Sequence, residues 1–181
     1  MLKEIQQVQA TADLLYSEGQ VEAALDNMAV SINDKLAGCN PLVLCVMNGG
    51  IVAAGKLLMR LAMPLTIDAI NASRYQNQTS GGTIKWVLKP GAPLKNRTIL
   101  IIDDILDEGI TLAAIKDYCL EQGATAVYCA VLVDKLLDHD KPIRADFVGL
   151  EIENRYLFGY GMDYKGYLRN AAGIYACKGG V

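Results

Sequence analysis

The chain has 181 residues and a formal net charge of −3, and 52% of its residues are hydrophobic, which fits one domain and excludes a mainly disordered chain. No basic run or patch occurs, so nucleic acid is a poor candidate for the main partner, and an anionic ligand has to be held by backbone N–H groups, a few basic side chains or a metal. The five cysteines form no C-x-x-C pair and no apolar run approaches the roughly 18 residues of a membrane span, so we expect reduced thiols in a cytoplasmic protein with no membrane partner.

The first half of the chain predicts helices and buried strands in alternation. Apolar side chains recur at helical spacing from Val21 to Leu36, and Gly38 ends that helix. Residues 74–83 contain a single apolar side chain among polar residues and glycines, and therefore predict a long mobile loop. The other elements expected here are a strand over 42–47 that closes on Asn48-Gly49-Gly50, a helix over 51–61, and strands over 65–72 and 84–88.

The second half contains the clearest strand of the chain. Strands that are apolar throughout and alternate with helices indicate an α/β fold, in which helices flank both faces of a parallel twisted sheet. Ligands of such sheets bind beyond the carboxyl ends of the strands, which singles out the loops at 47–50 and 103–111 and the stretch after 133. The elements predicted in this half are a strand over 98–103, a helix over 110–122 and a strand over 126–133.

The regular alternation fades after Lys135 into segments rich in Tyr and Gly. We therefore expect a single domain over residues 1–181, with a core at about 20–135. A small cap, or hood, is expected from residues 136–181 together with part of 1–19.

The strongest functional signal follows the clearest strand. That strand ends in Asp103 and Asp104, a short loop then carries Asp107 and Gly109, and Thr111 opens the next helix. Backbone N–H groups of such a loop and helix N-terminus can surround a phosphate, and Gly109 allows the backbone to turn close to the ligand. Asp103 and Asp104 suit the hydroxyl groups of a sugar or a hydrated magnesium ion. Acids near a helix start also act as caps, but this combination favours a site for a phosphorylated sugar.

This segment resembles the phosphoribosyl pyrophosphate signature of the type I phosphoribosyltransferases. Further motifs resemble the hypoxanthine-guanine branch of that family, over roughly residues 40–175. The resemblance implies the type I phosphoribosyltransferase fold with its hood, and purine salvage as the function. The phosphoribosyl group of phosphoribosyl pyrophosphate would pass to N9 of hypoxanthine or guanine, giving IMP or GMP and pyrophosphate. It also implies Mg²⁺ as cofactor and a homodimer or homotetramer.

The same resemblance assigns a role to each candidate residue. Asp107 is expected to accept a proton from purine N7, Lys135 to recognise the base and Tyr156 to stack on it. At the ribose and 5′-phosphate the resemblance places Asp103, Asp104, Asp107, Glu108, Gly109, Ile110 and Thr111, and at pyrophosphate it places Asn48, Gly49 and Arg169. At the purine it places Lys135, Tyr156, Leu157 and Asp163. It also places Arg74 and Tyr75 in a mobile lid, and Asp103, Asp104 and Asp163 near the metal.

The chain departs from the family pattern in three loops, one of them the lid, where Arg74 precedes Tyr75 in the place of the usual serine. Many relatives have a basic residue where this chain has Asn48, and Arg74 is a candidate to supply the missing charge. Glu108 stands where Thr is common, and beside a phosphate it should point outward. His139, the only histidine, is expected to be a solvated loop residue with no catalytic part. The alternative function is a regulator that binds phosphoribosyl pyrophosphate or a nucleotide without turnover, and the sequence does not rank hypoxanthine, guanine and xanthine.

Overall fold

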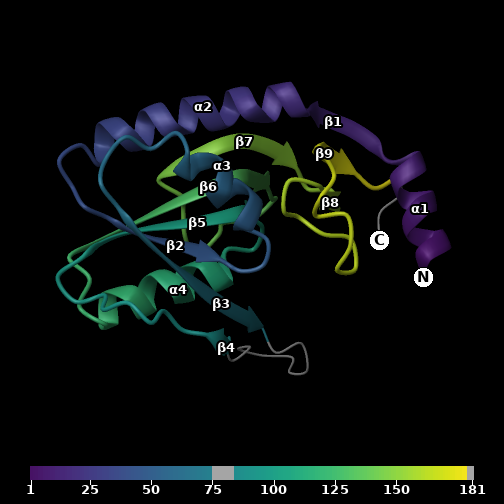
Figure 1. Ribbon diagram of the computed structural model, residues 1–181. Coiled ribbons are helices and arrows are strands. Elements are labelled where there is room, and N and C mark those ends of the chain that lie inside the picture. Colours follow the sequence, from purple (N-terminus) through teal and green to yellow (C-terminus); the bar gives the residue numbers. More distant parts are fainter. Residues whose placement is uncertain (75–83, 179–181) are drawn as a thin grey trace.

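A computed structural model describes residues 1–74 and 84–178 of the chain. A six-stranded sheet with the order β4-β3-β2-β5-β6-β7 forms its centre (Figure 1). Neighbouring strands pair in parallel except for β4, which runs antiparallel to β3 at one edge. The strands are β2 (Leu42–Val46), β3 (Thr66–Arg74), β4 (Ile84–Leu88), β5 (Thr98–Leu106), β6 (Ala126–Leu136) and β7 (Phe147–Glu153).

Helices cover both faces of this sheet, as the apolar strands predict. The helices are α2 (Glu18–Lys35) and α3 (Ile51–Leu58) on one face and α4 (Ile110–Glu121) on the other (Figure 1). The central strand β5 shows why its sequence is apolar throughout: Leu100 and Ile102 pack with α2 and α3, whereas Ile99 and Ile101 pack with α4. Because both faces of β5 are buried, the strand is held firmly and delivers the residues at its carboxyl end to a defined place.

The cap is a separate three-stranded antiparallel sheet in the order β1-β9-β8. Its strands are β1 (Asp13–Ser17), β8 (Leu157–Phe158) and β9 (Gly173–Ala176), so both terminal segments contribute to the hood, as expected. A helix absent from the sequence-based expectation, α1 (Leu2–Thr11), joins it. Ile5 of α1 packs with Phe158, Tyr164 and Leu168 of the cap, and Lys165 donates to Glu4 at 2.6 Å.

One boundary of the sequence-based expectation is wrong. Residues after 135 were expected in the cap, whereas β7 pairs in parallel with β6 and completes the core sheet. Only Phe147 and Ile152 of β7 are buried, because this edge strand is covered on part of its surface, and its pattern therefore resembles a loop. The β6–β7 connection, residues 137–146, also contains no helix, which removes the alternation that marks the earlier crossovers.

No helix within the described ranges 1–74 and 84–178 is both long and apolar enough to cross a membrane.

Candidate active site

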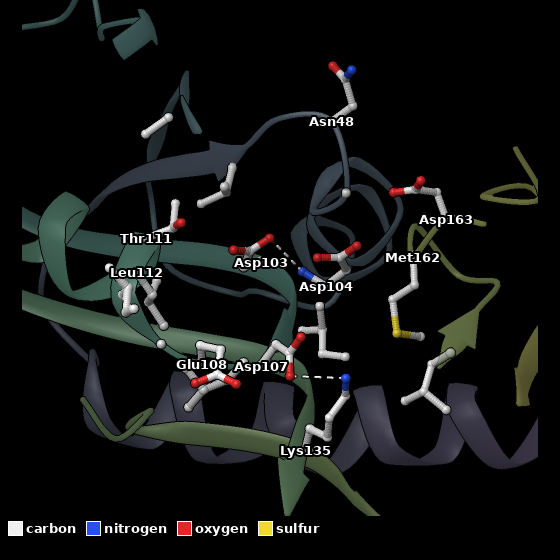
Figure 2. Close-up of a pocket in the computed structure, with 18 of the residues that line it drawn as sticks. Asn48, Asp103, Asp104, Asp107, Glu108, Thr111, Leu112, Lys135, Met162 and Asp163 are labelled. Carbon is white, nitrogen blue, oxygen red and sulfur yellow. Dashed lines mark hydrogen bonds and ion pairs between the residues drawn. The ribbon is translucent and has the colours of Figure 1, made fainter. Parts of the chain in front are cut away.

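A cleft of about 490 Å³ lies at the carboxyl ends of β2, β5 and β6, beside the cap (Figure 2). Every predicted site residue outside the lid lines this cleft, although the residues come from segments more than a hundred positions apart. The lid residues are the exception. Arg74 ends β3, and Tyr75 with the rest of the predicted loop lies outside the described residues.

Asp103 and Asp104 lie side by side where β5 meets the cleft. The Asp103 carboxylate accepts the N–H of Asp104 at 2.9 Å, and Asp104 is 7% exposed. Burial raises the pKa of both carboxyl groups, and the charge of Asp104 raises the pKa of Asp103 further. The positive charge of Arg169 opposes this rise in pKa, although its Nη1 lies 3.9 Å from Asp104 Oδ2, which is too far for a hydrogen bond. The pair is therefore two crowded acids that a cation or sugar hydroxyl groups would stabilise.

Two glycines allow the loop after β2 and the cap to approach these acids. A Cβ on Gly49 would overlap the Asp104 carboxylate, and a Cβ on Gly161 would overlap the Gly49 carbonyl. Gly161 also has φ +108°, a conformation that residues with a side chain rarely adopt. The loop itself contains a cis peptide bond between Met47 and Asn48, and Asn48 is exposed at the mouth of the cleft. The cap thus meets the loop through backbone atoms, and the loop backbone lies against the Asp104 side chain.

The loop after β5 leads into the N-terminus of α4. Gly109 adopts φ +76° and directly precedes the helix, and Ile110 and Thr111 of the first turn line the cleft. The N–H groups of a first helical turn have no partner within the helix, so an anion is favoured there. Asp107 is half-exposed, and its Oδ1 lies 3.0 Å from Nζ of the nearly buried Lys135 (Figure 2). The loop therefore presents an anion-binding helix end and a carboxylate paired with a lysine.

The neighbouring Glu108 turns toward a different partner. Its Oε2 lies 3.1 Å from His139 Nε2, and His139 Nδ1 lies 3.0 Å from Asp138 Oδ1. Hydrogen bonds with Asp138 and then Glu108 raise the pKa of His139. Sequence reasoning predicted His139 as an exposed loop residue, which is confirmed, but it missed this contact, because 31 positions separate the two residues.

Charged groups on the cap wall are paired with one another. Asp163 Oδ1 lies 2.5 Å from Arg169 Nη2, and its Oδ2 accepts the Gly166 N–H at 2.6 Å. Arg169 Nη1 also donates to the Gly161 carbonyl at 2.6 Å. These contacts hold the loops of the cap in one arrangement and leave Asp163 already satisfied.

The aromatic part of the cap wall is formed by Tyr156, which is 39% exposed. Its ring meets that of Tyr164 edge to face, with centroids 5.5 Å apart, and Leu157 follows it as the first residue of β8. Met162 also lines the cleft, although no sequence motif marked it. The wall offers an aromatic face and an apolar side chain, which suits a flat heterocycle.

The predicted metal residues do not form a closed metal centre. Within the parts of the chain that the structure describes, no three Asp, Glu, His or Cys side chains come together as metal ligands would. Asp163 pairs with Arg169, whereas Asp103 and Asp104 remain as adjacent carboxylates. Two hard oxygen donors fit a magnesium ion that keeps most of its water or takes further ligands from phosphates.

Comparison with known proteins supports the resemblance found in the sequence. The family model of the phosphoribosyl transferase domain matches residues 11–165. The hypoxanthine-guanine phosphoribosyltransferase of Lactococcus lactis is 31% identical over 89% of this chain and 88% of that protein. The chain also matches the bifunctional protein TilS/HprT of Listeria innocua with 33% identity, but it spans only 24% of that protein's length.

Solved structures agree with this assignment. A hypoxanthine-guanine phosphoribosyltransferase from Bacillus anthracis superimposes with a TM-score of 0.85 and 30% identity, covering 91% of this chain and 97% of the other. A hypoxanthine phosphoribosyltransferase from Staphylococcus aureus superimposes with a TM-score of 0.86 at 24% identity, over 92% and 91% of the two chains, which supports the fold. The α/β core with its hood is therefore shared with these proteins.

Proposed function

Because the chain belongs to the phosphoribosyltransferase family, and within it to the hypoxanthine-guanine branch, we propose that it transfers the phosphoribosyl group of phosphoribosyl pyrophosphate to N9 of hypoxanthine or guanine. The products are IMP or GMP and pyrophosphate, as expected for purine salvage in the cytoplasm. One observation carries the proposal: a lysine–carboxylate pair, two adjacent acids and a helix N-terminus line one cleft.

The Asp107–Lys135 pair matches one edge of a 6-oxopurine. The O6 and N7 atoms lie next to each other on that edge. Lys135 has only donors and complements the O6 acceptor, while Asp107, 3.0 Å away, complements an N7 that carries hydrogen. When N9 of the purine bonds to ribose C1, the C1–O bond to pyrophosphate breaks, and the N7 proton passes to Asp107. Tyr156 offers its ring to the purine face.

The ribose and its phosphates are assigned to the neighbouring groups. The 5′-phosphate accepts hydrogen bonds from the loop at 107–111 and the start of α4, far from the reacting carbon, so its binding energy serves to orient the ribose. Asp103 and Asp104 hold the ribose hydroxyls or the waters of Mg²⁺. Bound magnesium supplies positive charge beside the departing pyrophosphate. On the cap side, Arg169 exchanges its contact with Asp163 for pyrophosphate.

Asn48 and Gly49 complete the pyrophosphate site through backbone groups. We propose that the lid at 74–83 closes over bound substrates and excludes water from the activated ribose. Closure would bring Arg74 to the site and supply the positive charge that Asn48 lacks.

We also propose that the protein acts as a homodimer or homotetramer. Three large apolar side chains near α3, those of Ile51, Met59 and Ile67, are 52%, 87% and 63% exposed. An apolar groove of about 400 Å³ lies beside them, between α3, β2 and β3. Light scattering coupled to gel filtration will give the molar mass, and a monomer at micromolar concentration would refute this assignment.

Turnover is the decisive test of the proposed function. The protein is mixed with Mg²⁺, phosphoribosyl pyrophosphate and hypoxanthine, guanine, xanthine or adenine in turn, and nucleotide formation is followed by chromatography. We expect IMP and GMP, and a fall in kcat of about 10²- to 10³-fold in Asp107→Asn with little change in melting temperature. Asn retains much of the capping ability of Asp, so a loss of stability with intact turnover would identify Asp107 as a cap only. Binding of phosphoribosyl pyrophosphate without any product from the wild type would favour the regulator.

A further inference from the structure

The β6–β7 connection, residues 137–146, packs against the loop that carries Asp107. A Cβ on Gly109 would lie 3.1 Å from Ile143 Cγ2 and 3.5 Å from Pro142 Cδ. The connection therefore fills the space directly beside Gly109, at the start of α4. The irregular segment 137–146 thus supports the loop at 107–111, to which the 5′-phosphate is assigned.

Lys141 reaches from this connection to the ends of two strands. Its Nζ donates to the Leu106 carbonyl oxygen at 2.7 Å and to Asp134 Oδ1 at 2.6 Å. Leu106 and Asp134 are register partners at the carboxyl ends of β5 and β6. The Lys141 side chain is 11% exposed, so both hydrogen bonds are largely shielded from water and are costly to lose. Lys141 thus joins the two strand ends, and its two hydrogen bonds form the Lys141 clamp.

Each contact of Lys141 is made one residue before a side chain of the purine site. Leu106 directly precedes Asp107, and Asp134 directly precedes Lys135. A single ammonium group consequently binds the backbone carbonyl that precedes Asp107 and the side chain of the residue that precedes Lys135.

We propose that Lys141 is a positioning residue, which holds Asp107 and Lys135 in the spacing that N7 and O6 of a 6-oxopurine require. The inference rests on the proposed function. Lys141 does not line the cleft and acts only through the Leu106 carbonyl and the Asp134 carboxylate. Proton transfer at N7 depends on the placement of Asp107, and a displacement of about 1 Å can reduce a rate roughly 10²-fold.

The test compares Lys141→Met, which keeps the apolar stem, with Lys141→Arg, which keeps a charged donor. We expect kcat to fall roughly 10- to 10²-fold in Lys141→Met, while KM for phosphoribosyl pyrophosphate changes by less than about threefold. Lys141→Arg should recover most of the lost kcat. Lys165→Met is the control, because it removes a lysine–carboxylate pair of the same 2.6 Å length at the surface of the cap, and its kcat should match the wild type.

A double-mutant cycle separates positioning from general stability. In the Asp107→Asn background the acceptor whose position Lys141 controls is gone, so adding Lys141→Met should lower kcat by less than about threefold. The inference would be overturned if the reductions in kcat caused by Asp107→Asn and Lys141→Met multiply in the double variant. It would also be overturned if Lys141→Met lowers the melting temperature and leaves kcat unchanged. If Lys141→Met does not fold, Asp134→Asn replaces it in the cycle, because the amide oxygen can still accept from the Lys141 ammonium and only the charge of the carboxylate is lost.

Hydrogen exchange provides a readout that does not need turnover. Amide exchange across residues 106–111 should be at least about tenfold faster in Lys141→Met than in the wild type or in Lys165→Met. Equal exchange in all three proteins would refute the clamp whether or not the enzyme is active. Absence of transferase activity in the wild type, with faster exchange in Lys141→Met, would refute the proposed function and leave the clamp standing.

Discussion

The two walls of the cleft, one formed by β5 and the start of α4 and the other by the cap, hold their carboxylates in different ways. Asp103 and Asp104 on the core wall are adjacent, their pKa values are raised mainly by burial, and the nearest guanidinium contact is 3.9 Å long. Asp163 on the cap wall already accepts from Arg169 and from a backbone N–H. The core wall is thus prepared for an incoming cation, whereas the cap wall has to exchange partners before it can bind a ligand.

The rigidity of the walls differs in origin as well. The core wall is held by β5, which is buried on both faces, and by the Lys141 clamp. The cap wall is held partly by apolar packing of Met162 and Ile174 into the core, and partly by polar contacts, among them the Tyr160 hydroxyl, which donates to Glu22 of α2 at 2.6 Å. Glu22 also pairs with Lys56 and Arg60, so α2, the region of α3 and the cap meet at one carboxylate. Substitutions of Asp103 and Asp104 on the core wall should therefore affect turnover most, and substitutions in the contacts that hold the cap against α2 should mainly affect stability.

The largest effect is expected from the double substitution Asp103→Asn/Asp104→Asn. Loss of both charges should reduce kcat by about 10³-fold or more, since the proposed partners of the ribose hydroxyls and of the hydrated magnesium ion are removed. The fold should survive. Near-normal turnover in the double variant would remove the pair from the site and erase the contrast between the walls.

The same double variant tests how the stability of the protein depends on pH. An acid whose pKa is raised by folding is destabilising when charged, so the wild type gains stability as pH falls through the raised values toward about 4, the ordinary pKa of Asp. The melting temperature of the ligand-free wild type should rise over that window relative to the double variant. Parallel curves would show that the two carboxyl groups titrate normally.

Lys135→Ala should have the next largest effect. Removal of the ammonium proposed to face O6 should lower kcat/KM for hypoxanthine and guanine by about 10- to 10²-fold and narrow the gap in kcat/KM to adenine, whose amino group is a donor. The ratio of kcat/KM for hypoxanthine to kcat/KM for adenine, measured with both bases in competition, will show the change in preference. Unchanged preference would shift base recognition to the backbone around Leu157.

Gly161→Ala tests the close contact between the walls. Its Cβ would overlap the Gly49 carbonyl and strain a positive φ, whereas Gly166→Ala strains a similar φ of +85° with nothing within 4 Å of the new Cβ. Gly166→Ala should cost about 1 to 2 kcal/mol of unfolding free energy, and Gly161→Ala more. Equal losses in denaturant titrations would mean that the cap yields easily at this contact.

The smallest effect concerns the Glu22 carboxylate in the cap contact. Hydrogen bonds from Lys56 and then Tyr160 lower the pKa of Glu22 to about 2. A lowered pKa contributes stability above the ordinary Glu value of about 4.3, and this contribution is lost as pH falls through about 2. Glu22→Gln should therefore reduce the melting temperature by a few degrees at pH 7 and by less near pH 2. Identical losses at both pH values would show that Glu22 titrates alike in the folded and unfolded states.

Most of the core was accessible from sequence because its signals are local. The strand at 98–103 was predicted from a continuous apolar run, and the structure extends it to Leu106. The acids, Gly109 and Thr111 that follow were predicted to lie at one end of the sheet, and they line one cleft with Lys135. The sequence did not predict β7 or α1, because an edge strand and a docked terminal helix bury few of their residues.

The sequence by itself determined the α/β class, the position of the phosphate loop and the family, since these follow from apolar periodicity and from motifs of consecutive residues. Only the tertiary structure decided which polar groups meet: Asp163 with Arg169, Glu108 with His139, and Lys141 with both the Leu106 carbonyl and Asp134. The reason is physical. An ion pair between loops depends on the packing of the elements that carry them, and the residues of such a pair have no fixed spacing along the chain.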